Sequence, residues 1–63
     1  MTEIEDVVCI LETKDAVLCR LEATGKEFWV PKSLISDDSE VYKLGTDGKL
    51  VIPEWLAVEN ELV

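Results

Sequence analysis

Two runs of alternating apolar residues, separated by one polar turn, constrain the fold of this chain more than any other feature. The runs are Ile4–Leu11 and Ala16–Glu22, and both are rich in β-branched and aliphatic residues. The residues that share one face of each extended run are Val7, Cys9 and Leu11 in the first and Val17, Cys19 and Leu21 in the second. Alternation with a period of two predicts strands that are half buried.

The polar residues Thr13, Lys14 and Asp15 predict that the two runs form a β-hairpin with a three-residue loop. The cross-strand pairs of this register are Glu12 with Ala16, Leu11 with Val17, Cys9 with Cys19, and Val7 with Leu21. Every apolar face then meets another, which favours the register.

The middle of the chain predicts a third strand and a short helical turn. Glu27–Val30 is aromatic and β-branched, follows a turn that contains Gly25, and ends at Pro31. After this proline, Lys32–Ile35 suits a single 3₁₀ turn whose Leu34 and Ile35 would plug one end of a barrel.

The last third predicts a second hairpin and a helix. Val41–Leu44 and Lys49–Ile52 flank Gly45–Gly48, which has the composition of a tight turn with left-handed residues. Pro53 suits the start of a helix, and the residues that recur at helical spacing after it are Trp55, Val58 and Leu62. Together these elements predict a single mostly β domain over residues 1–63. Its expected architecture is a five-stranded SH3-like or Tudor-like barrel with a short C-terminal helix, and an OB-like barrel is the alternative.

The charge limits which partners the chain can bind. Fourteen acidic residues against six basic ones give a net charge of −8, which opposes direct contact with DNA or RNA because phosphate binding depends on cations. Such a field steers a protein toward basic surfaces. The alternative is that the charge only keeps a small protein soluble.

Catalytic and metal-binding chemistry is not expected. The chain has no histidine and no Gly-rich phosphate loop, and its two cysteines, Cys9 and Cys19, cannot complete a zinc site. We expect them to be free core thiols. Asp37 and Asp38 could in principle hold a divalent ion or exchange protons, but a solvated acidic loop is favoured. The sequence therefore predicts no enzyme and no cofactor.

Three acidic clusters are candidate partner-binding residues. They are Glu3-Glu5-Asp6, Asp37-Asp38-Glu40 and Glu54-Glu59-Glu61. If the clusters lie on one side, they would complement a groove of Arg and Lys and could mimic a phosphate backbone. If they scatter around the domain, this interpretation loses its basis.

The apolar candidates are two tryptophans and a second face of the first hairpin. Trp29 points outward if Phe28 and Val30 fill the core, so it is a candidate binding or dimer contact. Trp55 is expected to cap the barrel, with a partner contact as the alternative. The second apolar face consists of Val8, Ile10 and Leu18, for which we expect either inward curling or a homodimer through the first strand.

Three segments carry a resemblance to a known group of proteins. Phe28–Ile35, Asp38–Val41 and Gly48–Ala57 resemble, in order, a pattern of short uncharacterised proteins of phages and prophages, and the likeness covers residues 16–57. The resemblance implies a small acidic protein from a mobile element but brings no catalytic residue. Proteins of this kind often block a host machine, including restriction and CRISPR systems.

The leading hypothesis is therefore that the chain acts in the cytoplasm of the host cell. It would bind a host protein with a basic surface and inhibit or adapt it. A nucleic-acid-handling or anti-phage defence enzyme is the favoured target. No run approaches the roughly 18 apolar residues of a membrane span, so no membrane partner is expected. The alternative function is a self-associating structural or accessory subunit of a phage assembly.

Overall fold

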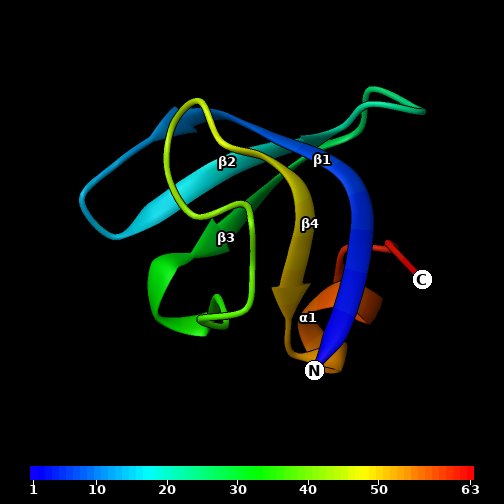
Figure 1. Cartoon of the computed structure of the whole chain (residues 1–63). Coiled ribbons are helices and arrows are strands. Elements are labelled where there is room, and N and C mark those ends of the chain that lie inside the picture. The colour runs from blue at the N-terminus through cyan, green and yellow to red at the C-terminus, as the bar shows by residue number, and fades with distance from the viewer.

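The computed structural model describes residues 1–63 and contains one four-stranded antiparallel sheet and a short C-terminal helix (Figure 1). The elements are β1 (Thr2–Glu12), β2 (Ala16–Leu21), β3 (Glu27–Pro31), the 3₁₀ helix η1 (Lys32–Leu34), β4 (Asp47–Ile52) and α1 (Glu54–Glu59). The strand order in the sheet is β3-β2-β1-β4. The prediction of a mostly β domain with a terminal helix is confirmed, and the prediction of five strands is wrong.

The strand predicted at 41–44 is a turn instead. The hydroxyl of Thr46 accepts hydrogen bonds from the backbone N–H groups of Tyr42 and Lys43 and donates one to the carbonyl oxygen of Lys43. The N–H of Gly45 then bonds to the carbonyl of Cys9 at 3.2 Å. Because these local bonds use the backbone groups that a strand would need, the segment folds over β1 as a turn.

The first hairpin keeps half of its predicted register. Cys9 faces Cys19 and Val7 faces Leu21 as expected, but a bulge at Ile10 pairs Leu11 with Leu18 and Glu12 with Val17. The predicted pairs of Leu11 with Val17 and of Glu12 with Ala16 are therefore wrong. The N–H of Thr13 bonds to the carbonyl of Ala16, and the Thr13 hydroxyl accepts from the N–H of Ala16, so only Lys14 and Asp15 remain in the loop. The extra residue in β1 compensates for this loop, which is one residue shorter than predicted.

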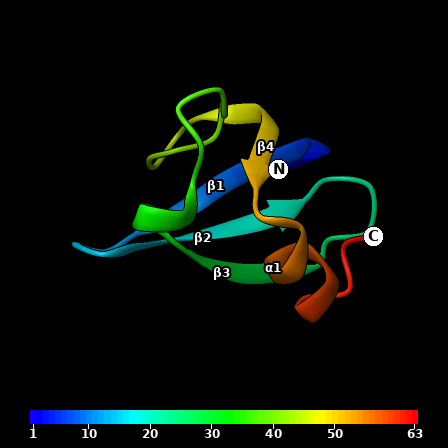
Figure 2. The same ribbon diagram turned by 90° about the horizontal axis from the view of Figure 1, so that it is seen from below.

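A second bulge bends β1 so strongly that one strand can serve two neighbours. The register between β1 and β4 shifts between Ile4 and Val7, where Asp6 has a φ of 57°. Figure 2 shows β4 turned away from the plane of β1, β2 and β3. No pairing joins β3 to β4, so the sheet curls without closing into a barrel.

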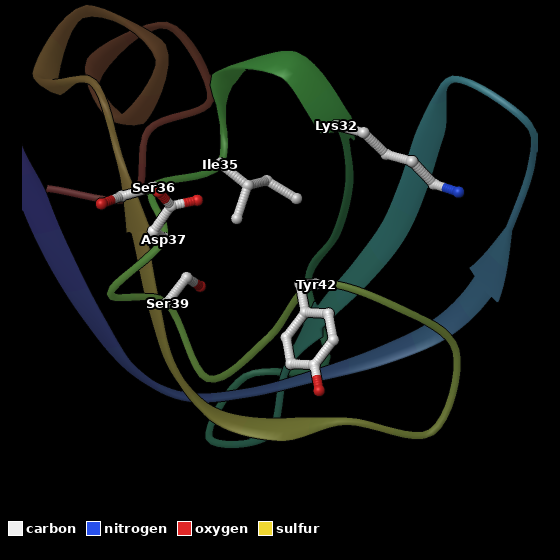
Figure 3. Close-up of a pocket in the computed structure, with 6 residues that line it drawn as sticks. All are labelled: Lys32, Ile35, Ser36, Asp37, Ser39 and Tyr42. Atoms are coloured by element: carbon white, nitrogen blue, oxygen red, sulfur yellow. The ribbon is translucent and has the colours of Figure 1, made fainter.

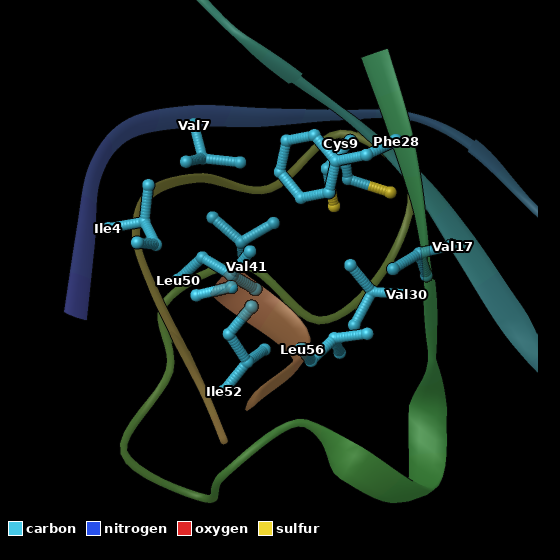
Figure 4. Packing of buried hydrophobic residues seen from close by; sticks show 12 residues of the cluster. Ile4, Val7, Cys9, Val17, Phe28, Val30, Val41, Leu50, Ile52 and Leu56 are labelled. Atoms are coloured by element: carbon cyan, nitrogen blue, oxygen red, sulfur yellow. The ribbon is translucent and has the colours of Figure 1, made fainter. Parts of the chain in front are cut away.

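Apolar side chains from the inner face of the sheet and from α1 form one core (Figure 4). Its twelve buried residues are Ile4, Val7, Cys9, Val17, Cys19, Phe28, Val30, Val41, Leu50, Ile52, Leu56 and Ala57. Leu34, Ile35 and Leu62 pack partly buried against it. Leu56 lies near Ile52 and Val30 in Figure 4, so α1 covers the gap between the two strands that do not pair.

Two predicted inner residues are not in this core. Leu11 is 53% exposed, because the bulge at Ile10 turns it to the outer face. Trp55 is 57% exposed, so the prediction that it caps the barrel is wrong. Its neighbours Leu56 and Ala57 take that role, since a six-residue helix can bury only one narrow stripe.

The segment 36–41 covers the outer edge of β4 and bonds to its backbone through both side chains and backbone N–H groups, in the place of a further strand. The buried hydroxyl of Ser39 accepts from the N–H of Val51, and a carboxylate oxygen of Glu40 accepts from the N–H of Lys49. The carbonyl groups of Val51 and Lys49 accept from the N–H groups of Ser36 and Glu40. This edge of the sheet is thus hydrogen-bonded at Lys49 and at Val51.

Candidate protein-binding surfaces

Residues of all three acidic clusters lie around β4. Glu3 pairs with Val51 in the sheet, and Asp37 and Asp38 follow Ser36, whose N–H bonds to the carbonyl of Val51. Glu54 begins α1, and only Pro53 separates it from the end of β4 at Ile52. We name as the β4-side acidic surface the exposed residues Glu3, Asp37, Asp38, Glu40, Asp47 and Glu54.

Little basic charge offsets this surface. Lys49 lies 3.8 Å from the carboxylate of Glu3, and Lys43 lies over the ring of Tyr42 at 5.6 Å. Asp37 and Asp38 make no ion pair and no side-chain hydrogen bond. Their carboxylates are therefore free to meet a partner.

The charge is unevenly distributed along the chain. Residues 13–32, which include β2, β3 and their flanking turns, carry four basic and three acidic side chains. The rest of the chain carries two basic and eleven acidic side chains. Segments 1–12 and 33–63 therefore carry all of the net negative charge.

One pocket of about 480 Å³ adjoins this surface (Figure 3). Its lining residues are Lys32, Ile35, Ser36, Asp37, Ser39 and Tyr42. The ammonium group of Lys32 is paired with Glu12, and the hydroxyl of Ser39 is used by the backbone of β4. The Asp37 carboxylate and the Ser36 hydroxyl, which accepts only from the N–H of Asp38, thus provide the available polar contacts of the pocket.

The bond to Lys32 also affects the acidity of Glu12. The hydrogen bond from the Lys32 ammonium, and after it the one from the N–H of Leu44, lower the pKa of the Glu12 carboxyl. The three residues join the end of β1 to the start of η1 and to the turn at 42–46. This contact positions one wall of the pocket.

The outer face of the sheet carries the apolar candidates predicted from the sequence. Val8, Ile10 and Leu18 lie there partly buried, and Leu18 is the direct cross-strand partner of Trp29, which is 48% exposed. Leu11 joins this group opposite Leu18. The predicted outward orientation of Trp29 is confirmed.

The remaining candidates lie elsewhere. Trp55 and Glu59 are exposed on α1, which packs on the inner side of the sheet through Leu56 and Ala57. Trp55 and Trp29 are therefore on opposite sides of the sheet. Glu59 ends α1, away from the β4 end of the helix, and Glu61 follows it with a φ of 58°.

Both cysteines are buried and free, in the core positions that the sequence predicts. Desolvation by burial, with the neighbouring Cys9 as the smaller cause, raises the pKa of the Cys19 thiol to about 12. Desolvation also raises the pKa of Cys9. Since the thiolate is the reactive form, these positions disfavour nucleophilic chemistry.

Comparisons with other proteins identify no family. No protein-family model matches the chain, and no curated protein or solved structure is significantly similar to it. In the structure itself, no three metal-ligating side chains come together, and no helix has the length and apolar character to cross a membrane.

Sequence reasoning missed two parts of these surfaces. The exposure of Leu11 depends on the bulge at Ile10, which leaves no mark in an alternating pattern. The strand predicted at 41–44 includes Tyr42, which instead lies in a turn and lines the pocket. The signal available for it was Thr46, whose hydroxyl lies within reach of the backbone three and four residues earlier.

Proposed function

We propose that this chain is a non-enzymatic protein-binding domain whose β4-side acidic surface docks on a basic surface of a larger protein. The observation that carries the proposal is the concentration of carboxylates around β4, of which Asp37 and Asp38 have no intramolecular partner. A field of one sign accelerates encounter with a partner of the other sign and selects against acidic partners.

The partner we favour is a host protein that handles nucleic acid, including a restriction or CRISPR enzyme, which the domain would inhibit or adapt. The surface offers carboxylates in place of phosphates, and the pocket beside Asp37 suits a Lys or Arg side chain. The resemblance of residues 16–57 to short phage and prophage proteins gives the biological context of the proposal. Classification as an open SH3-like or Tudor-like barrel belongs to the same proposal and rests on the bent β1 and the 3₁₀ turn after β3.

The test uses affinity capture from a bacterial lysate with two variants of equal charge. Asp37→Lys/Asp38→Lys reverses the β4 side, and Asp15→Lys/Glu22→Lys makes the same change in charge at exposed residues beside β2. Proteins identified by mass spectrometry should be recovered by the wild type and by the second variant but lost by the first. Equal recovery by both variants would remove the acidic surface from the account.

A second function, a self-associating accessory subunit, is favoured by the apolar outer face with Leu18 and Trp29. Such a subunit should recover only itself from the lysate. Salt separates the two functions as well, because exposed charge pairs are screened over about 8 Å at physiological ionic strength, whereas apolar contacts are not.

A further inference from the structure

The two edges of the sheet differ in how their backbone groups are satisfied. Ser39, Glu40 and Ser36 cover β4, as described above. At the other edge, the carbonyl of Lys26 accepts from the N–H of Leu21, and the N–H of Lys32 bonds to the carbonyl of Asp15. Between these two positions, alternate residues of β3 bond to β2. In an antiparallel ladder, Glu27 and Trp29 must then direct their backbone groups away from β2.

These outward groups have no partner in the molecule. No hydrogen bond of the structure involves the N–H of Glu27 or of Trp29 outside the sheet, and neither residue makes a hydrogen bond through its side chain. Glu27, Trp29 and Pro31 are all exposed, and no segment hydrogen-bonds to this edge, to which Pro31 contributes a carbonyl group alone. A row of unpaired backbone N–H and C=O groups is a template for a further strand.

We propose that two copies of the chain pair through the outer edges of their β3 strands, in antiparallel orientation, to form one continuous eight-stranded sheet across a dimer. Charge distribution selects a second copy as the occupant. Residues 13–32 carry four basic and three acidic side chains, so β3 can approach β3 while the acidic halves stay at opposite ends. Contact through β4 would instead bring the two β4-side acidic surfaces together.

Side chains support the same arrangement. Trp29 is the central residue of β3, and it lies beside Leu18 on the outer face. Antiparallel pairing about Trp29 joins its N–H and C=O to those of its counterpart and brings two tryptophans and two leucines into one apolar strip. Because the β4 edge of each copy is covered, pairing stops at two copies.

The inference is independent of the proposed docking of the acidic surface, and the two interactions respond oppositely to salt. Docking of the acidic surface on a basic partner weakens as salt rises. The dimer joins two molecules of charge −8 through their nearly neutral sides, so salt leaves it unchanged or strengthens it. Loss of one interaction therefore does not imply loss of the other.

The main experiment compares Glu27→Pro with Glu27→Ala by sedimentation velocity. Both variants lose the exposed ion pair with Arg20, but only proline removes the outward N–H, which makes no bond in the monomer. The wild type and Glu27→Ala should reach twice the 7.1 kDa mass of one chain within about 1 µM to 1 mM, and Glu27→Pro should weaken the dimer about tenfold or more.

Amide hydrogen exchange on the wild type keeps the test valid if Glu27→Pro fails to fold. Exchange at Trp29 should slow as protein concentration rises, while Lys14, whose N–H is unbonded in the turn between β1 and β2, exchanges quickly throughout. A monomer at all concentrations would overturn the proposal. A dimer unaffected by Glu27→Pro but lost in Leu18→Glu would also overturn it, because that dimer would use the face of the sheet.

Discussion

At the residue scale, Ser39 does more for the fold than its size indicates. Its side chain is buried, and the hydroxyl accepts from the N–H groups of Val41 and Val51 and donates to the carbonyl of Val41. A single side chain thus replaces part of a neighbouring strand. The acidic loop that precedes it is held in place by the same bonds.

Replacing Ser39 should therefore destabilise the protein markedly. Ser39→Ala leaves the N–H of Val51 buried without an acceptor, and we expect the free energy of unfolding to fall by about 1–3 kcal/mol in urea. Ser33→Ala is the control, since Ser33 is exposed and its hydroxyl makes no hydrogen bond. Equal effects of the two substitutions would show that the edge does not depend on this hydroxyl.

The buried thiol of Cys19 predicts a specific loss of stability in alkali. Its pKa rises from an ordinary value of 9.0 to about 12 in the folded protein, chiefly through desolvation. The folded state therefore keeps its proton where the unfolded chain loses it. The contribution to stability is complete below pH 9 and is lost as pH rises toward 12.

Urea unfolding of the wild type and of Cys19→Ala across this range checks the prediction. The wild type should lose stability more steeply with pH, by about 1.4 kcal/mol per pH unit for the one group. Other groups titrate equally in both proteins, so the difference in slope belongs to Cys19. Parallel pH profiles would mean that the thiol ionises as readily in the folded protein as in the unfolded chain.

At the scale of elements, the bulges of β1 decide the shape of the sheet. Asp6 has a φ of 57°, in the left-handed region, and it lies at the bulge where β1 bends from β2 toward β4. Its carbonyl also accepts from the N–H of Glu22 at 2.9 Å. The bend lets one long strand contribute to both halves of a core that a flat sheet could not enclose.

The effect of a substitution at Asp6 on stability should depend on how readily the new residue adopts a positive φ. Asp6→Val places a β-branched residue in the left-handed region and should lower the free energy of unfolding by about 1–2 kcal/mol, whereas Asp6→Gly should be neutral or stabilising. Glu5→Val, at the exposed residue before it, controls for the change of side chain. Thermal unfolding of the three variants checks the order, and a tolerated Asp6→Val would refute the role of the bulge.

The elements that the sequence predicted correctly are those in which side-chain alternation decides burial. In β3, Phe28 and Val30 are buried and Trp29 is exposed, as their period of two requires. The errors arose where a backbone detail decides: the bulge at Ile10 turned Leu11 outward, and the Thr46 hydroxyl converted the strand expected at 41–44 into a turn. For α1 the start was predicted but the buried stripe was not, since Leu56 and Ala57 take the place expected of Trp55.

For the site, composition predicted the acidic surface, but only the fold could place it. Glu3, Asp38 and Glu54 are far apart in sequence and meet around β4 because β1 pairs with β4 and the segment 36–41 covers its outer edge. No local pattern contains that pairing. The separation of Glu59 and Glu61 from the other carboxylates likewise follows from the direction of α1.

At the scale of the whole molecule, the chain is polarised. Its β4 side carries the free carboxylates and the pocket with Asp37, and its β3 side carries nearly balanced charge and the open edge. Two separate contacts can therefore coexist, a charged one with a basic partner and a backbone-mediated one with a second copy. A dimer of this kind would present two acidic surfaces and so gain avidity for a repetitive or symmetric target.

The association rate constant of the captured partner, measured against ionic strength by stopped flow, tests the central claim most directly. For the wild type and Asp15→Lys/Glu22→Lys, the rate constant should fall about tenfold or more between roughly 0.05 and 0.5 M NaCl, because the β4-side field steers the encounter. Asp37→Lys/Asp38→Lys should associate slowly at every salt concentration. A wild-type rate constant that does not change with salt would contradict recognition through the acidic surface.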